Sequence, residues 1–275
     1  MRYTKMHGAG NSFILTENLH GELQGEDLSV LALRLCSPLT GPGADGLIVL
    51  IPARDADFGM LFYNADGSLG EMCGNGARCL ARYGVEHGLA RDPQRIRIRA
   101  TAGLVLARRI DAERYEVRLN DPGLIELHRP AFDGQREISC AYTELGNPGI
   151  PHAVVGVGPE DFRNLDTLRE RGRALRHSPA FPRGANVTFA CPVGENRVRA
   201  ITFERGVEDF TQACGTGCGA TALCLTLLGQ LSDAPVNIDM PGGRLSVRLT
   251  REGKTARDLL LTGPTAVVER GEMAL

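Results

Sequence analysis

The hydrophobic and polar positions in the first half of the chain predict short strands interrupted by two helices. Alternating or short apolar runs predict strands at residues 2–6, 13–16, 47–51 and 57–63. Helical spacing of apolar residues predicts helices at 28–36 and 76–87. A hairpin around 101–103 and a strand at 113–119 complete this half, which ends in the turn sequence Asn120-Asp121-Pro122-Gly123.

The second half repeats this order of elements. Its helix at 219–228, however, has fewer polar residues than the corresponding helix of the first half. The helix at 76–87 places its apolar residues on one stripe, formed by Ala77, Leu80, Ala81, Gly84 and Val85. The helix at 219–228 has almost no polar face, so we expect it to be buried all round. A helix threaded through a curled sheet would meet this requirement.

Two nearly identical turns precede these helices. Met72-Cys73-Gly74-Asn75-Gly76 and Ala213-Cys214-Gly215-Thr216-Gly217 lie 141 residues apart (214 − 73). Four further pairs of segments match in the same order at an offset of 140 or 141: 8–13 with 149–154, 45–48 with 186–189, 62–64 with 202–204, and 98–103 with 238–243. Five matches in the same order, at offsets of 140 or 141, predict two similar halves related by a pseudo-twofold axis.

Length and charge narrow the class of protein. A chain of 275 residues exceeds the usual single domain, so two halves that each bury a core are expected. The net charge of −2 gives no electrostatic reason to expect nucleic acid or an anionic membrane as a partner. The longest apolar run, 47–51, is far shorter than the roughly 20 residues that a bilayer requires, and residues 1–7 lack the apolar region of a signal peptide. We therefore expect a cytoplasmic protein.

The eight cysteines are predicted to be reduced thiols, because they are dilute and no export signal is present. Five of them are expected to be small buried hydrophobes: Cys36, Cys79, Cys140, Cys191 and Cys224. The role of Cys218 stays open. Zinc is the rival interpretation, but the sequence has no CxxC pair and no histidines at ligand spacing from the cysteines, so no metal site is predicted.

The two remaining thiols, Cys73 and Cys214, are candidates for acid–base chemistry. A cysteine at the start of a helix meets the positive end of the macrodipole and unpaired N–H groups, which favour the thiolate. The glycines that follow allow a close approach of the backbone to a ligand. The N–H groups of Gly74, Asn75, Gly215 and Thr216 could therefore hold the α-carboxylate of an amino acid. One thiolate and one thiol on opposite faces of the α-carbon would then invert it.

An isolated copy of the Cys-Gly-polar-Gly turn would more simply be a helix start with a buried cysteine, but two symmetry-related copies favour chemistry. No cofactor is predicted for it. Lys5 and Lys254 are the only lysines, and neither lies in a setting typical of a pyridoxal phosphate Schiff base. The sequence also lacks a Walker A pattern and a strand-bound GxGxxG.

Several segments together resemble the diaminopimelate epimerase family: 5–11, 62–68, 73–79, 203–206, 213–217 and 240–243. The resemblance runs from Lys5 to about Pro264. It implies cofactor-independent conversion of LL- to meso-diaminopimelate in lysine and peptidoglycan precursor biosynthesis. It also implies an α/β (α+β) fold of two pseudo-symmetric halves, each a curled, mainly antiparallel sheet around a central helix, with the active site in the cleft between them. The C-terminal strand, roughly 264–269, would return to the first half, giving units 1–120 plus 264–275 and 121–263.

Carried over by position, the resemblance makes Cys73 and Cys214 the acid–base pair. Substrate contacts would come from Asn64, Asn186, Glu204 and Arg205, with Asn11 and His152 lining the same site. This mixture suits a double zwitterion, because an arginine grips a carboxylate bidentately and a glutamate accepts from an ammonium group. Without the resemblance, the asparagines would be turn residues and the Glu204-Arg205 pair a weak surface ion pair.

Two positions depart from the pattern that is common in the family. Gly149-Ile150-Pro151-His152 has an isoleucine where many members have asparagine, although Asn147 lies nearby. Phe210 stands where an acidic residue is common. These departures leave the thiol chemistry intact but bear on the substrate.

Three hypotheses follow from the sequence. The favoured one is the diaminopimelate epimerase, acting on a small amino-acid substrate with no nucleic acid or membrane partner. The second is a racemase or epimerase of the same architecture that acts on another amino acid. The third is a non-catalytic protein that binds an amino acid at the paired helix starts. The sequence leaves open whether the chain forms a homodimer.

Overall fold

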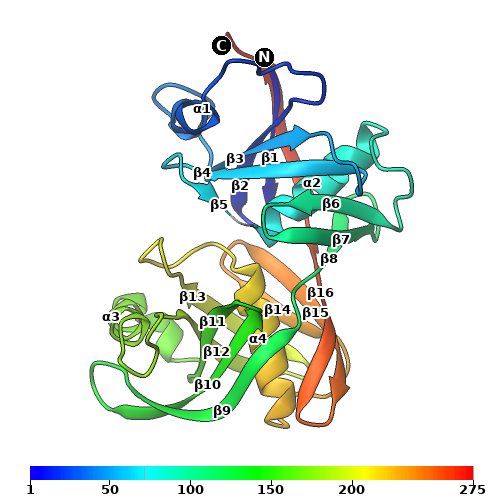
Figure 1. Cartoon of the computed structure of the whole chain (residues 1–275). Helices are drawn as coiled ribbons and strands as arrows, with labels where there is room; N and C mark the ends of the chain where they lie inside the picture. The colour runs from blue at the N-terminus through cyan, green and yellow to red at the C-terminus, as the bar shows by residue number, and fades with distance from the viewer. Residues whose placement is uncertain (71, 275) are drawn as a thin grey trace. The chain divides into compact units, whose positions relative to one another are not determined.

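The computed structural model describes residues 1–70 and 72–274. The chain forms two compact units, one containing Met1–Arg118 and the C-terminal segment from Thr262, the other containing Leu119–Leu261 (Figure 1). The boundaries expected from the sequence, after residues 120 and 263, lie two residues further along (120 − 118, 263 − 261).

The first unit is a mixed sheet with two helices. Its strands and helices are β1 (Arg2–Gly8), β2 (Asn11–Glu17), α1 (Leu28–Cys36), β3 (Gly46–Ile51), β4 (Phe58–Asn64), β5 (Leu69–Gly70), α2 (Gly74–Glu86), β6 (Ile96–Ala100), β7 (Gly103–Arg109), β8 (Arg114–Arg118) and β17 (Ala266–Glu272). The pairing order is β17-β1-β2-β3-β4-β6-β7-β8. Only β2–β3 and β4–β6 among these pairs are parallel, and β5 pairs with β4.

The second unit repeats this arrangement with longer strands. Its elements are β9 (Pro122–Phe132), β10 (Glu137–Gly146), β11 (Gly149–Gly156), the 3₁₀ turn η1 (Asp161–Arg163), α3 (Leu165–Arg176), β12 (Asn186–Gly194), β13 (Arg197–Phe203), α4 (Gly215–Leu227), β14 (Val236–Met240) and β15 (Gly243–Glu252). β16 (Thr255–Pro264) carries the chain back into the first unit.

The internal duplication is visible in how the strands pair. β2–β3 and β11–β12 are parallel, β3–β4 and β12–β13 antiparallel, β4–β6 and β13–β14 parallel, and β6–β7 and β14–β15 antiparallel. The helices α2 and α4 begin 141 residues apart (215 − 74) at the same point of this order. The repeat that was predicted from the offset of short motifs is confirmed.

Each sheet is covered by helices on both faces. Leu47 and Val49 of β3 pack with Leu31 and Leu35 of α1, whereas Ile48, pointing the other way, reaches the start of α2. Because successive strand residues face opposite sides, a strand buried on both faces reads as a continuous apolar run, as 47–51 does. In the second unit α3 covers the equivalent outer face, where Gly172 lies against Phe203.

The central helices α2 and α4 are the most deeply buried. In α4, 11 of the 13 residues are buried, which confirms the prediction of a helix enclosed on all sides. In α2 the buried residues extend beyond the predicted stripe and include Asn75 and Arg78. The single stripe was therefore too narrow, because the curled sheet encloses this helix as well.

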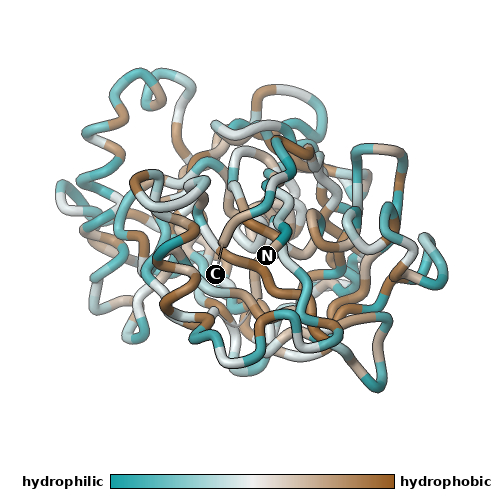
Figure 2. The backbone as a smooth tube through the Cα atoms, turned by 90° about the horizontal axis from the view of Figure 1, so that it is seen from above, coloured by the Kyte–Doolittle hydropathy of each residue, from teal (hydrophilic) through white to brown (hydrophobic). Residues whose placement is uncertain are grey.

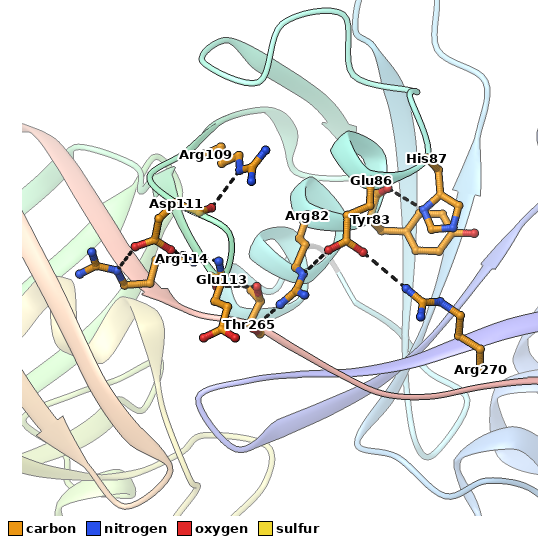
Figure 3. A network of polar contacts seen from close by, with 10 residues as sticks. All are labelled: Arg82, Tyr83, Glu86, His87, Arg109, Asp111, Glu113, Arg114, Thr265 and Arg270. Atoms are coloured by element: carbon orange, nitrogen blue, oxygen red, sulfur yellow. Dashed lines mark hydrogen bonds and ion pairs between the residues drawn. The ribbon is translucent and has the colours of Figure 1, made fainter.

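The C-terminal segment returns to the first unit, as expected from the sequence, and it does so at two places. β17 pairs antiparallel with β1 over its length. Just before it, the carbonyl oxygen of Thr265 accepts a hydrogen bond from Arg82 of α2, at 2.7 Å, and Arg270 forms an ion pair with Glu86 of the same helix (Figure 3). The last strand therefore anchors the end of the helix that begins beside Cys73.

Hydrophilic positions gather in the turns, as the teal segments at the periphery of Figure 2 show. Across residues 1–70 and 72–274, no helix has the length and apolarity needed to cross a membrane.

Candidate active site

The two central helices, α2 and α4, differ from the outer helices, α1 and α3, in the kind of residue at the N-cap. Asp27 caps α1 by accepting hydrogen bonds from the backbone N–H groups of Ser29 and Val30, and Asn164 caps α3 in the same way. Such caps are the usual solution for the unpaired N–H groups of a first turn. In α2 and α4 the N-cap residue is a cysteine instead, Cys73 and Cys214, each with extended backbone angles. Both sulfurs therefore belong to residues at the positive ends of their helices.

In the second unit, Cys214 lies in a small polar cluster. Its sulfur accepts a hydrogen bond from the backbone N–H of Gly217 at 3.3 Å and lies 3.6 Å from the hydroxyl of Thr216. The Glu204 carboxylate, which follows β13, is hydrogen-bonded to the same thiol. The Thr211 hydroxyl also donates a hydrogen bond to this carboxylate, at Glu204 Oε1. Cys214 itself is only 5% exposed.

The charges in this cluster favour a proton on Cys214. Burial raises the pKa of the Cys214 thiol well above its usual value, and the negative charge of Glu204 raises it further. Burial also raises the pKa of Glu204, although hydrogen bonds from Thr211 and Cys214 oppose this effect. A carboxylate and a thiolate this close would repel each other, so an ionised Glu204 favours the protonated form of Cys214.

The remaining predicted residues of this unit form a second cluster. His152 in β11 pairs in register with Asn186 in β12. The side-chain oxygen Oδ1 of Asn186 accepts a hydrogen bond from the backbone N–H of Arg205 at 2.9 Å, which fixes the turn that carries Glu204. The Arg205 side chain is exposed, and it donates to the carbonyl oxygen of Arg183. Asn186 thus has a structural part in this turn.

His152 is completely buried, and neither ring nitrogen has a hydrogen-bond partner within residues 1–70 and 72–274. Burial, together with the nearby charge of Arg205, lowers its pKa to about 3. The ring is therefore neutral at pH 7, with one nitrogen able to donate and the other to accept.

In the first unit, the described contacts centre on Asn75. Its Nδ2 donates to Asn11 Oδ1 at 2.9 Å, and its Oδ1 accepts from Arg78 at 2.7 Å. Cys73 and Gly74, directly before it, are half-buried. Asn64 is exposed at the end of β4, where its amide donates to Ser68 Oγ at 2.9 Å, the turn role that sequence reasoning had allowed for it.

The structure also identifies residues that the sequence reasoning missed. Arg78 supports Asn75, and Thr211 supports Glu204. A signal for Arg78 was present, because a charged residue beside the apolar stripe of a buried helix needs a reason to be there. Nothing local marked Thr211, whose contact depends on how the loop folds back on β13. Cys218, left open by the sequence, is 1% exposed within α4.

The predicted packing cysteines are buried as expected. Cys36, Cys79, Cys140, Cys191 and Cys224 are all at most 5% exposed, and all eight cysteines are free thiols.

Several known proteins are similar in sequence to the whole chain. The family model described as diaminopimelate epimerase matches residues 3–122 and 145–268. Proteins named diaminopimelate epimerase are similar over the whole chain: 35% identity in Hydrogenobaculum sp., covering 100% of this chain and 99% of the relative, and 34% in Bacillus subtilis, covering 98% and 97%. A third, from Methanothrix thermoacetophila, is 37% identical and covers 98% and 95%.

The chain belongs to the diaminopimelate epimerase family.

Solved structures share the fold of this epimerase-family chain. A PhzF-family phenazine biosynthesis protein from Bacillus anthracis aligns with a TM-score of 0.78 at 14% identity, covering 100% of this chain and 99% of that one. A probable proline racemase from Agrobacterium radiobacter aligns with a TM-score of 0.74 at 19% identity, covering 100% and 93%. At these identities the likeness concerns the fold, and it confirms the predicted fold class.

The two departures from the common family pattern have different surroundings in this epimerase-family protein. Phe210 packs edge-on against Phe189 and Phe203, with ring centroids 6.4 and 6.0 Å away, so its side chain belongs to the core of the second unit. Ile150 is half-buried near the start of β11, and Asn147 is exposed in the preceding turn.

Gly217→Ala tests whether the position of the Cys214 sulfur matters. A Cβ at Gly217 would lie 3.1 Å from Cys214 Sγ and 3.0 Å from Thr202 Oγ1, both tighter than ordinary contacts. Since alanine is the better helix former, we expect stability to change little while kcat falls by about 10²-fold through misplacement of the thiol. Steady-state kinetics and thermal unfolding measure the two effects.

Gly156→Ala is the matched control, because a Cβ there meets nothing within 4 Å. Wild-type turnover in Gly217→Ala would show that the sulfur tolerates displacement or does not take part in the chemistry.

The buried neutral histidine predicts a pH-dependent stability. The folded state holds His152 at a pKa of about 3, whereas the unfolded chain takes up its proton near the ordinary value of 6.5. Stability from this group is therefore complete above pH 6.5 and is lost as the pH falls towards 3. Between pH 7 and pH 5 this amounts to about 2 kcal/mol of the free energy of unfolding.

Urea unfolding of wild type and His152→Met at both pH values isolates this effect, because the other groups titrate alike in the two proteins. The variant should lose about 2 kcal/mol less than wild type. Equal losses in the two proteins would mean that His152 is protonated in the folded state or becomes hydrated there.

Proposed function

We propose that this protein is an isomerase that epimerises LL-2,6-diaminopimelate to meso-2,6-diaminopimelate without a cofactor, with Cys73 and Cys214 as the acid–base pair. The observation that carries the proposal is the cysteine N-cap of both central helices, at equivalent points of a duplicated fold, in a chain of the diaminopimelate epimerase family. The reaction would supply the precursor of lysine and peptidoglycan.

In the proposed reaction, one thiolate removes the α-proton and the opposite thiol returns a proton to the other face of the carbon. Proton transfer by positioned groups of this kind contributes about 10²–10⁴-fold to a rate. The helix N-termini supply what the chemistry needs besides protons. The N–H groups of Gly74, Asn75, Gly215 and Thr216 would hold the α-carboxylate and stabilise the charge that develops at the α-carbon.

The other predicted residues would recognise the rest of the substrate. Glu204 would accept from the α-ammonium group, and the exposed guanidinium of Arg205 would bind a carboxylate. Asn11 and Asn64 would donate from their amides, and His152 and Asn186 would line the site. The turn that Asn186 holds in place is the one that presents Glu204 and Arg205, so its contribution would be indirect.

The test is incubation with LL-diaminopimelate in deuterated water. Formation of the meso isomer with deuterium at one α-carbon is expected, measured by chiral chromatography and mass spectrometry. L-Proline and trans-4-hydroxy-L-proline serve as comparison substrates, because the fold is shared with a probable proline racemase and a hydroxyproline epimerase. Inversion of one of these with none of LL-diaminopimelate would overturn the substrate. Binding without exchange of the α-hydrogen would indicate a non-catalytic binding protein.

We also propose that the enzyme acts in the cytoplasm, where its biosynthetic substrate would be made, and that it takes neither nucleic acid nor membrane as a partner. A homodimer is part of the same proposal, and sedimentation velocity tests it.

A further inference from the structure

The loop between α3 and β12, residues 178–184, holds the side chain of Arg205. The Arg205 guanidinium donates from Nη1 to the carbonyl oxygen of Arg183 at 3.1 Å, and the backbone N–H of Arg205 donates to Asn186 Oδ1 at 2.9 Å. A guanidinium has five N–H donors in a rigid, planar fork, and the contact with Arg183 involves only one of its nitrogens. The direction of this group therefore depends on where the loop places the Arg183 carbonyl oxygen.

A stack of side chains attaches the middle of this loop to the sheet. Phe181 is 2% exposed, and its ring stacks on Tyr142 of β10, with the centroids 5.3 Å apart and the planes at 12°. The guanidinium of Arg129 in β9 lies 3.9 Å from the centroid of the Tyr142 ring. Arg129 also donates to the carbonyl oxygen of Ala180 at 3.2 Å. Strands β9 and β10 thus hold the loop just before Arg183.

An ion pair attaches the end of the loop to the same strand. Arg183 Nη2 lies 2.5 Å from Glu144 Oε2, and the Tyr142 hydroxyl donates to Glu144 Oε1 at 2.6 Å. Burial alone would raise the pKa of Glu144, but hydrogen bonds from Tyr142 and Arg183 lower it below its usual value. Burial and the bond to Glu144 raise the pKa of Tyr142 to about 12. At pH 7 the carboxylate is therefore charged and the phenol protonated, as both bonds require.

The setting of this ion pair makes it a stronger restraint than a free surface pair. An exposed ion pair is usually worth little, because two long side chains must be ordered to form it. The Glu144 side chain is 20% exposed and is already held by the Tyr142 hydroxyl. The backbone at Arg183 is held by the buried ring of Phe181, two residues earlier. Much of the ordering is therefore supplied by other contacts, and the pair fixes the carbonyl oxygen that Arg205 uses.

The internal repeat shows that this ion pair is a feature of the second unit. Arg183 corresponds to Pro42 (183 − 141), whose carbonyl oxygen also accepts a hydrogen bond from a cation, Lys5 Nζ, at 2.9 Å. Glu144 corresponds to Tyr3 (144 − 141). A proline and a tyrosine cannot form an ion pair at pH 7. The pair is thus added in the copy whose carbonyl-bound cation, Arg205, is a predicted substrate contact.

We propose that Glu144 and Arg183 are positioning residues of Arg205. Their ion pair fixes the Arg183 carbonyl oxygen, this oxygen directs the Arg205 guanidinium, and the directed fork binds a substrate carboxylate in one orientation. Carboxylate binding by Arg205 rests on the proposed function. The ordering of the Arg205 side chain by Glu144 does not.

The first test measures the order of the Arg205 side chain without substrate. ¹⁵N relaxation of the arginine Nε–H groups reports their motion on the picosecond-to-nanosecond timescale, and the signal that is missing in Arg205→Lys identifies Arg205. In Glu144→Ala the order parameter of this group should fall from its wild-type value into the range of mobile groups, below about 0.6. Arg183→Met should have the same effect, because it breaks the same ion pair and keeps the backbone carbonyl group.

Glu252→Ala is the matched control. It breaks another exposed ion pair of the second unit, which Glu252 forms with Arg257 at 2.9 Å. The Arg205 order parameter should equal that of wild type in this variant. An unchanged Arg205 order parameter in both Glu144→Ala and Arg183→Met would overturn the proposal.

The second test separates positioning of Arg205 from a general effect on the fold. Glu144→Ala and Arg183→Met should each raise KM for LL-diaminopimelate about fivefold, the effect of one weakened hydrogen bond, and leave kcat within about twofold of wild type. Adding Glu144→Ala to Arg205→Met should leave KM where Arg205→Met alone puts it, because two residues that act through one contact are not additive.

A further rise in KM in the double variant would show that Glu144 acts by another route and would overturn the proposal, as would an equal rise in KM in Glu252→Ala. If wild type does not epimerise LL-diaminopimelate, the proposed function fails. The relaxation measurement then still decides whether Glu144 and Arg183 order the Arg205 side chain, because it needs no substrate.

Discussion

Replacing either Cys73 or Cys214 by alanine is expected to reduce epimerisation by at least about 10³-fold, because each thiol makes a proton transfer that the other cannot make from the opposite face. Both variants should fold. Each sulfur lies at the start of a helix whose remaining residues hold it in place, and the Cys214 side chain contributes one weak N-cap hydrogen bond. Meso-diaminopimelate formation measured by chiral chromatography, with circular dichroism as the check on folding, gives the result.

The matched controls are Cys36→Ala in the first unit and Cys191→Ala in the second, which remove buried thiols from the packing of each sheet. They should keep most of the activity. Near-normal turnover in Cys73→Ala or Cys214→Ala would contradict the two-base mechanism, even if the other variant were inactive.

Glu204→Gln is expected to lower kcat by about 10²-fold and to move the alkaline limb of the pH–rate profile to lower pH. The carboxylate raises the pKa of the Cys214 thiol, so an uncharged amide in its place should let Cys214 ionise more readily. As the pH rises, the acid of the reaction is then lost earlier. The size of the loss reflects the failure to keep one thiol protonated while the other is ionised.

Glu208→Gln is the control for this change. Glu208 lies four residues further along the same loop, where it forms an ion pair with Arg176 and lies 3.2 Å from His177 Nε2. A glutamine could still accept the Gly206 N–H. Its activity and pH profile should match wild type. An alkaline limb that stays in place in Glu204→Gln would mean that some other group holds the Cys214 proton.

The hydrophobic pattern within short segments predicted most of the helices and strands in their correct order. The helix at 28–36 was predicted with the bounds that α1 has, and the buried run 47–51 became β3, because period and composition within a short window report which faces are buried. The start of α4 was placed at 219 instead of 215. The segment 215–218 contains two glycines and therefore has a poor intrinsic helix propensity. It becomes helical because Cys214 caps it and the sheet buries it.

Some features of the candidate site could also be predicted from the sequence, whereas others depend on the fold. Both cysteines could be found from the sequence, because a duplicated motif at one offset is a property of the chain alone. The contact between Asn11 and Asn75 joins residues 64 apart (75 − 11), and that between Glu204 and Cys214 depends on a loop that folds back onto β13. No window of sequence reports such pairings.

By itself, the sequence determined that this chain is built from two copies of one unit, that each copy places a thiol before its central helix, and that the chain resembles the diaminopimelate epimerases. The tertiary structure decided how the surroundings of the two copies differ: a buried arginine bonds to Asn75 at one helix start, and the Glu204 carboxylate raises the pKa of the thiol at the other. The physical reason is that repetition and periodicity are written along the chain. The charge that a sulfur experiences is set instead by burial and by neighbours that only folding brings together.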